Sequence, residues 1–370
     1  MKNLLRRFWP VILIPGVLFY LFHEAIFPPF PAWVLSREAG DVSTLYYYWR
    51  HFGFESLRGG FIPLWNPFIF CGVPFAAYPE SALFYPPNLI FLLLPLARAL
   101  NWSFIIHMAG LAFFQYLFLR RLESGRWASI LGALTLVLGA PVILHITAGH
   151  LSNLCSMAWL PILFLTAASF ARWKRPVWAV ALGVGGGLQI LAGHWQYVFY
   201  SAIWIFIFLI YAFLTRRDFK KSHWITLATG MAVAALVALG LTAIQVVPAL
   251  SLAEESFRKT LDYRWAATFS LPPINLLTVL SPSFLGDSLR SLYWGRNYFW
   301  EMCGYIGLIP LGLAISGLLL RRRRLSLFFA LMAVGSLILA LGGYTPLFRG
   351  LYLTVPGFRY FRGSAKFLFF

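Results

Sequence analysis

Long apolar runs alternate with short polar links along most of the chain. The runs approach 20 residues, which is the length that an α-helix needs to cross a bilayer. They predict an all-α polytopic membrane protein with nine to ten transmembrane helices. The tenth run begins near residue 363 and is cut off by the end of the sequence, so we expect a fragment of a longer protein. The predicted spans are residues 8–27, 101–119, 127–146, 151–170, 177–193, 197–214, 224–247, 303–320 and 325–342.

Composition and charge agree with this assignment. The chain is 60% hydrophobic and 11% charged, whereas soluble domains carry roughly 25% charged residues. The net charge of +18 would suit a nucleic-acid partner, but more than half of the 30 Lys and Arg residues fall in every second link. This alternation marks the cytoplasmic side, so the N-terminus is predicted inside and nucleic acid is not an expected partner. The basic clusters are Lys2, Arg6 and Arg7; Arg120, Arg121 and Arg126; Arg172, Lys174 and Arg175; Arg216, Arg217, Lys220 and Lys221; and Arg321 to Arg324.

Two long segments are predicted on the extracytoplasmic side, residues 28–100 and 248–302, within a single domain that covers residues 1–370. Long connections of this kind usually carry function. The first contains an apolar stretch, residues 83–97, that is too short to cross the membrane and is expected to form an interfacial or re-entrant helix. No Asp, Glu, Lys or Arg falls in the middle of a predicted span, which disfavours an ion-coupled transporter.

Asp41 follows the first span closely, next to the aromatic residues of TLYYYW. A carboxylate at this place can remove a proton from an attacking hydroxyl. Alternatively, the Gly-Asp pair before a helical run is an ordinary helix N-cap. The residues alone leave both interpretations open.

The stretch from Gly59 to Asn88 is rich in Pro, Gly and aromatic residues, with Asn66 and Glu80 among its few polar positions. Tyr and Trp suit a membrane interface, and they also suit a sugar-binding wall. The second outer segment holds basic residues that the positive-inside rule does not explain, and Arg binds phosphate through paired hydrogen bonds. Salt bridges to neighbouring acids are the alternative for these basic residues. They are Arg258, Lys259, Arg264 and Arg296, and the last predicted outer segment adds Arg359, Arg362 and Lys366.

Two Gly-His turns, TAGH ending at His150 and LAGH ending at His194, face the same predicted side. A zinc site needs three or four ligands, and neither HxxxH nor HExxH occurs, so no metal ligands are assigned. The histidines and the nearby Gln196 are candidates for hydrogen bonds to a phosphate or a sugar. The alternative is that Gly only permits a tight turn at a wet interface.

Several motifs together resemble the YfhO-like family of bacterial membrane proteins: PLWNPFIFCGVP, FYPPN, the two Gly-His turns, WEMCGYIGLIPL and FRGSAKFLFF. The resemblance runs from about residue 40 to the last residue, and that family is similar to GT-C glycosyltransferases. It implies a multi-pass enzyme of the bacterial cytoplasmic membrane that moves a sugar from a polyprenyl-phosphate carrier to an acceptor polymer, lipid or protein of the cell envelope. The carboxylate expected as the base corresponds to Asp41, with Glu38 three residues earlier.

On this basis Asp41 is the predicted catalytic residue of a single inverting displacement. The predicted substrate-binding residues are Glu38, Asn66, Glu80, His150, His194, Gln196, Arg258, Arg264, Arg362 and Lys366. No cofactor is assigned, and a divalent metal is compatible with the chemistry although nothing in the sequence indicates one. A transporter or flippase for a lipid-linked sugar and a non-catalytic partner in envelope assembly are the alternative functions.

Overall fold

The protein is described by a computed structural model in which helices account for 73% of the structure. Its side chains are described from residue 12 onward. Within the described residues, the only paired strands are the short β1 (Trp65–Asn66) and β2 (Val73–Pro74), so the chain is an all-α protein apart from one small hairpin. The described residues are 2–28, 30, 33–37, 40–216, 220–256, 262–287, 292–320 and 323–370.

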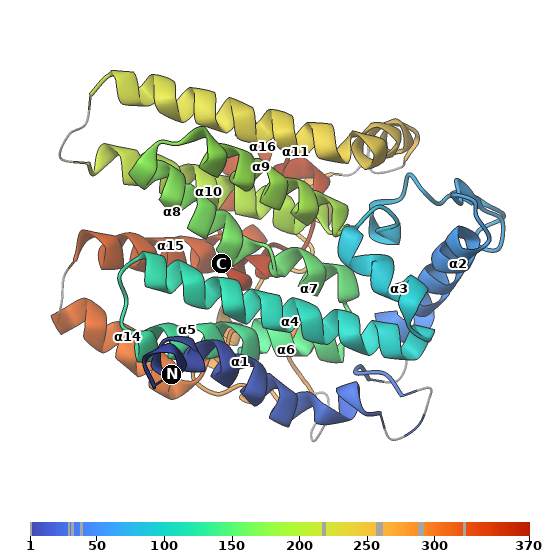
Figure 1. The fold of residues 1–370 in the computed structure, drawn as a ribbon, viewed down its shortest axis with the longest axis horizontal. Helices are drawn as coiled ribbons and strands as arrows, with labels where there is room; N and C mark the ends of the chain where they lie inside the picture. Colours follow the sequence, from blue (N-terminus) through green and yellow to red (C-terminus); the bar gives the residue numbers. More distant parts are fainter. Residues whose placement is uncertain are drawn as a thin grey trace. The chain divides into compact units, whose positions relative to one another are not determined.

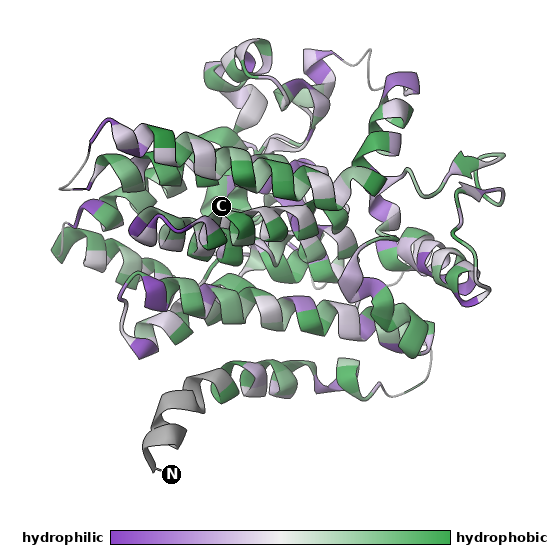
Figure 2. Cartoon of the chain, turned by 45° about the horizontal axis from the view of Figure 1, so that its top comes forward, coloured by the Kyte–Doolittle hydropathy of each residue, from purple (hydrophilic) through white to green (hydrophobic). Residues whose placement is uncertain are grey.

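Each of the nine predicted spans overlaps one or more α-helices of the described chain, and hydrophobic residues dominate these helices (Figure 2). Five segments of the described chain are long and apolar enough to cross a membrane, and four further apolar helices are shorter. A multi-pass membrane protein is therefore supported, while the count of nine to ten spans stays a prediction. The long segments are Leu96–Arg121, Arg126–Thr147, Leu151–Trp173, Trp195–Leu214 and Ser222–Glu255, and the shorter ones are Ile12–Ile26, Pro176–Leu191, Leu308–Leu320 and Arg324–Ala340.

The chain divides into two compact units, each of which is described by itself. Unit 1 comprises Met1–Ala133 and Ala148–Glu254, and unit 2 comprises Leu134–Thr147 and Glu255–Phe370. The predicted single domain of residues 1–370 stays a prediction. The helices of unit 1 (Figure 1) are α1 (Lys2–Ile26), the π-helical η1 (Val42–Tyr46), α2 (Tyr47–Arg58), η2 (Pro79–Ser81), η3 (Pro86–Leu89), α3 (Ile90–Leu93), α4 (Leu96–Arg121), most of α5 (Arg126–Leu138), α7 (Leu151–Met157), α8 (Leu160–Trp173), α9 (Pro176–Leu191), α10 (Trp195–Leu214) and α11 (Ser222–Glu255).

Helix α8 lies at the centre of unit 1 and packs against α4, α9 and α10, while α1 packs against α4. Small residues bring α9 and α11 together, because a Cβ atom added at Gly183 would lie 2.5 Å from the carbonyl oxygen of Ala234. Gly187, one turn later, meets Ala238 in the same way at 3.5 Å. Close approach through glycines four residues apart is typical of helix packing in membranes, where apolar burial alone does not favour helix association.

The basic links of unit 1 gather at one end of its helices. Arg121 donates to the hydroxyl of Ser169 at 3.2 Å and lies over the ring of Trp173, and Arg216 donates to the carbonyl of Ala171 at 2.7 Å. Arg172 pairs with Glu123 at 3.6 Å at the same end. The residues before α7 and α10 lie at the opposite end, about 30 Å away for a helix of 20 residues. This separation of charge is the one expected from the alternating basic links.

Unit 2 contains the end of α5 and several short helices around two apolar ones. The helix is interrupted after α5, and the amide of Ala140 stabilises this break by donating a hydrogen bond to the carbonyl of Tyr305 at 2.8 Å. Helix α15 packs against the last 3₁₀ turn, whose Phe367 is fully buried. The elements are α6 (Ala140–Thr147), α12 (Tyr263–Ala266), η5 (Pro273–Val279), α13 (Phe299–Met302), α14 (Leu308–Leu320), α15 (Arg324–Ala340), η6 (Gly342–Tyr344), α16 (Pro346–Thr354), η7 (Phe358–Tyr360) and η8 (Ser364–Phe369).

Several boundaries differ from the predictions. The stretch 83–97 is not one interfacial helix, because Leu94 is extended before Pro95 and so separates α3 from α4. Helix α4 begins at Leu96, and α11 continues through Pro248 to Glu255, so both long segments are shorter than 28–100 and 248–302. The last run forms the 3₁₀ turn η8 and not the start of an α-helix.

Candidate functional site

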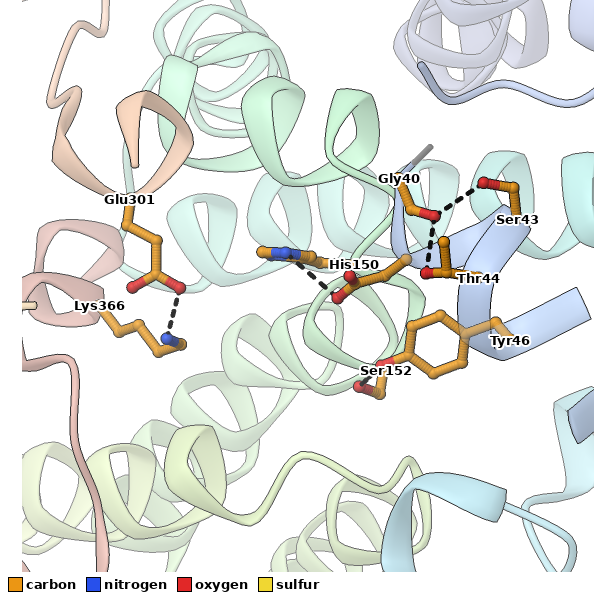
Figure 3. Close-up of polar contacts among 9 residues, drawn as sticks. Gly40, Ser43, Thr44, Tyr46, His150, Ser152, Glu301 and Lys366 are labelled. Atoms are coloured by element: carbon orange, nitrogen blue, oxygen red, sulfur yellow. Dashed lines mark hydrogen bonds and ion pairs between the residues drawn. The ribbon is translucent and has the colours of Figure 1, made fainter. Parts of the chain in front are cut away.

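Asp41 does not serve as a helix cap. It occupies the N-cap position of η1 with helical backbone angles (φ −59°, ψ −24°), and its side chain makes no capping hydrogen bond. The carbonyl of Gly40 instead accepts hydrogen bonds from the hydroxyls of Ser43 and Thr44, at 2.9 and 3.1 Å (Figure 3). The capping alternative is therefore wrong, and the Asp41 carboxylate is available for another role at a helix N-terminus, where negative charge is favoured.

The carboxylate of Asp41 is paired with His150. The Oδ2 atom of Asp41 lies 3.4 Å from Nε2 of His150. The Asp41 side chain is 49% exposed, whereas the His150 side chain is 13% exposed. One oxygen can thus be oriented by the imidazole while the carboxylate still reaches solvent.

The first Gly-His turn supports Asp41 directly. The amide of Asp41 donates to the carbonyl of Ala148 at 3.0 Å. Gly149 has a φ of +81°, and a Cβ atom added there would lie 2.7 Å from the amide nitrogen of Val42 and 3.0 Å from that of Asp41. Glycine is therefore required both by the left-handed backbone and by the close approach of η1.

The second Gly-His turn supports Glu80 in the same manner. Gly193 has a φ of +99°, and an added Cβ would lie 2.6 Å from the carbonyl oxygen of Pro79 and 3.1 Å from the Cα of Glu80. The amide of His194 donates to the hydroxyl of Ser156 at 3.2 Å, which fixes the turn on α7. The two copies of AGH thus hold two acid-bearing segments of the first long segment.

Arg50 is a component of the site that the sequence analysis missed. It is only 1% exposed, and its Nη1 atom donates to the backbone carbonyls of Glu80, at 3.1 Å, and Ser81. Its guanidinium also lies over the rings of Tyr46 and Phe91, at 5.6 and 5.8 Å. Burial lowers the pKa of Arg50 from its usual value. A signal was present in the sequence, because an Arg in a predicted outer segment is not explained by the positive-inside rule.

Tyr46 links the two acidic positions. Its hydroxyl lies 2.5 Å from the hydroxyl of Ser152 at the start of α7 (Figure 3). Burial raises the pKa of Tyr46 well above its usual value, and the negative charges of Glu80 and Asp41 raise it further. The phenol therefore stays neutral and can donate a hydrogen bond.

The remaining candidates in unit 1 have mainly internal partners. Asn66 is buried, and its Oδ1 accepts from the amide of Phe68 at 3.0 Å, which stabilises the turn of the hairpin. Gln196 is buried and donates to the hydroxyl of Tyr200 at 2.8 Å. The ring of His194 packs against that of Tyr197, with centroids 4.9 Å apart. Asn66 thus has a structural role, and His194 and Gln196 directly follow Gly193, which contacts Pro79 and Glu80.

The described basic candidates belong to unit 2. Lys366 donates to Oε1 of Glu301 at 2.6 Å, and both side chains are about nine-tenths buried (Figure 3). Its charge is therefore already compensated, which argues against the predicted role in holding phosphate. Arg362 is exposed and lies over Phe269, 5.2 Å from the ring centroid, and Arg264 is exposed on α12.

Two predicted binding residues, Glu38 and Arg258, lie outside the described residues. Among the rest, unit 1 brings Asp41 and His150 into contact, and Arg50, which lies over Tyr46, binds the backbone carbonyl of Glu80. Nothing in the sequence spacing pairs these residues, because the contacts join segments far apart in the chain.

The arrangement has the properties of a site for proton transfer. It combines a half-exposed carboxylate, an adjacent imidazole, a second carboxylate and a buried cation near a bundle end. Comparison with known proteins adds no assignment, because no family model, curated protein or solved structure matches the chain. The functional argument for this chain therefore depends on the geometry of its own residues.

Proposed function

We propose that this protein is a GT-C-type glycosyltransferase of the bacterial cytoplasmic membrane. It would move a sugar from a polyprenyl-phosphate carrier to an envelope polymer, lipid or protein at the extracytoplasmic face. The observation that carries the proposal is the pairing of the half-exposed Asp41 with His150 at the end of unit 1 opposite its basic links. A general base must be accessible to its substrate and held in a defined orientation, and Asp41 meets both conditions.

In the proposed step, the carboxylate of Asp41 accepts the proton of the acceptor hydroxyl. The hydroxyl oxygen forms a bond to the anomeric carbon as the bond from that carbon to the phosphate oxygen breaks. The electron pair of the broken bond leaves with polyprenyl phosphate, and a single displacement inverts the anomeric centre. His150 holds the carboxylate through Nε2, and Glu80, whose backbone contacts Arg50 and Gly193, is the proposed acceptor of hydrogen bonds from sugar hydroxyls.

A negatively charged leaving group needs a cation nearby, since charge develops on the phosphate as the sugar departs. Arg264 and Arg362, which are both exposed on unit 2, keep the phosphate-binding role predicted from the sequence. Arg258 keeps the role predicted from the sequence. Lys366 is not included, because Glu301 already neutralises its charge.

The direct test is transfer of label from radiolabelled undecaprenyl-phosphate hexoses to envelope acceptors by the purified full chain in proteoliposomes. Replacing Asp41→Asn removes the proton acceptor at nearly constant volume, and we expect a loss of transfer of about 10²–10⁴-fold. Glu55→Gln is the matched control, because Glu55 is an exposed acid in the same segment that pairs with the exposed Arg58 three residues later. Its transfer should stay within about twofold of the wild type.

Two outcomes would contradict the proposal. Full transfer by Asp41→Asn would remove this residue from catalysis. Movement of the lipid-linked sugar across the bilayer without a new glycosidic bond would identify a flippase, and neither movement nor transfer with any hexose would favour a non-catalytic role in envelope assembly.

A further inference from the structure

The segment between Arg58 and Glu80 contains no charged residue over 21 positions, 59–79. In the outer part of this segment, residues 61–71, several apolar side chains are exposed and are not packed inward. Phe68 is 80% exposed and Phe70 is 90% exposed. Four further apolar residues of the same part are more than half exposed, namely Phe61, Ile62, Leu64 and Trp65. A contiguous apolar surface of this kind marks a site of interaction.

The segment is built as a hairpin with a buried base. Strands β1 and β2 pair antiparallel, with Trp65 opposite Pro74. Phe75, directly after β2, is only 1% exposed and packs in a core with Trp49 and Leu83. The base therefore anchors the hairpin in unit 1, and its other end carries the exposed apolar residues.

The turn of the hairpin satisfies several of its backbone groups internally. The amide of Gly72 donates to the carbonyl of Ile69 at 2.8 Å, and the amide of Phe68 donates to Oδ1 of Asn66 at 3.0 Å. The amide of Phe75 donates to the carbonyl of Leu64 at 2.8 Å. Internal pairing of backbone groups is the condition for placing a non-helical segment in an environment poor in water.

The backbone at the turn directs aromatic side chains outward at a conformational cost. Phe70 and Cys71 have φ values of +49° and +60°, which bulky residues rarely adopt. Gly72 follows with a φ of +109° and lies against the indole of Trp65, where an added Cβ would be 2.3 Å from Cζ2. Strain held by the surrounding structure is often associated with function.

We propose that residues 61–71 form a hairpin that inserts into the bilayer leaflet at the end of unit 1 that carries Asp41. A lipid surface fits better than a protein or a polysaccharide, because the segment has no charge to match a polar partner and belongs to a chain with membrane-spanning helices. Trp65 suits the interfacial region, and Phe68 and Phe70 suit the acyl chains beneath it. The inference does not depend on the proposed glycosyl transfer.

Cys71 provides a native reporter at the turn, because it is exposed while Cys155 and Cys303 are buried. A nitroxide attached to Cys71 of the full chain in phosphatidylethanolamine–phosphatidylglycerol vesicles should collide with molecular oxygen several-fold more often than with a water-soluble nickel chelate. The matched control is a nitroxide at Glu55→Cys in a Cys71→Ser background, in the same segment but on an exposed charged face. There the nickel chelate should dominate.

A second variant tests the apolar side chains themselves. Phe68→Ser with Phe70→Ser should shift the Cys71 nitroxide toward access by the nickel chelate, while circular dichroism and gel-filtration elution stay as in the wild type. Nickel access at Cys71 equal to that of the Glu55→Cys control would overturn the proposal, because the hairpin would then lie in water. Protection of the Cys71 nitroxide from both reagents would overturn it as well, because a protein contact would then cover the surface.

Discussion

Replacing Gly149 by alanine tests whether the first Gly-His turn positions Asp41. The perturbation adds a Cβ atom 2.7 Å from the amide nitrogen of Val42, at a residue with a φ of +81°. An L-residue in the left-handed region costs about 1–2 kcal/mol, and the contact with Val42 forces η1 to move in addition. This cost corresponds to an increase of about 5–30-fold in the population of locally opened states.

Gly193→Ala is the parallel variant at the second turn. Its Cβ would lie 2.6 Å from the carbonyl oxygen of Pro79, so it should disturb the segment that carries Glu80. Gly186→Ala, inside α9, is the matched control, because the nearest atom would be the Cβ of Ala238 at 3.9 Å. Alanine is favoured over glycine by up to about 1 kcal/mol inside a helix, so this control should be neutral or stabilising.

Hydrogen–deuterium exchange by mass spectrometry measures these effects locally in lipid nanodiscs. Gly149→Ala should accelerate exchange in peptides covering residues 41–46, where the amide of Asp41 donates to Ala148, and leave residues 79–85 unchanged. Gly193→Ala should give the opposite pattern. Equal acceleration of both segments by either variant, or no acceleration by either, would refute the view that each turn supports one acidic segment.

Two further predictions concern membrane orientation and the ion pair of unit 2. In intact cells, a membrane-impermeant maleimide should label Glu55→Cys in a Cys71→Ser background. Glu123→Cys, which is exposed in a predicted cytoplasmic link, should react only after permeabilisation. The reverse pattern would show that the predicted topology is inverted. Lys366→Met should destabilise unit 2 by about 3–5 kcal/mol, because it leaves the Glu301 carboxylate buried without its ammonium partner. Thermal unfolding in detergent should show a partial recovery when Glu301→Gln is added, and a double variant less stable than Lys366→Met would contradict this explanation.

The positions of the apolar helices could be predicted from the sequence because hydrophobic runs are a local property. The run predicted at 197–214 corresponds to α10 (Trp195–Leu214), and the run at 325–342 corresponds to α15 (Arg324–Ala340). Helix boundaries were less predictable where a proline, which usually interrupts a helix, lies inside one. Pro248 lies within α11, where a sequence criterion would end the helix, because the surrounding helix tolerates one missing hydrogen bond.

The candidate site could be predicted only as a set of residue types on one side of the membrane. Asp41, Glu80 and the two histidines could be named from the sequence as residues in or beside the first long segment, but the contact of Asp41 with His150 was not predictable. Tyr46 and Ser152 share a hydrogen bond across 106 positions of sequence, and no local pattern encodes a contact of that length. Arg50 was missed for the same reason, since its role depends on carbonyl groups that are brought to it by folding.

By itself, the sequence determined that the chain forms apolar helices and that every second link between them is basic, since the length, hydrophobicity and charge of each segment are local properties. Only the tertiary structure decided that Asp41 meets His150 and does not cap its own helix, and that Lys366 is neutralised by Glu301. It also decided that the side chains of Phe68 and Phe70 are exposed. These properties depend on which backbone and side-chain groups from distant segments occupy the same space, and that is set by packing and not by local composition.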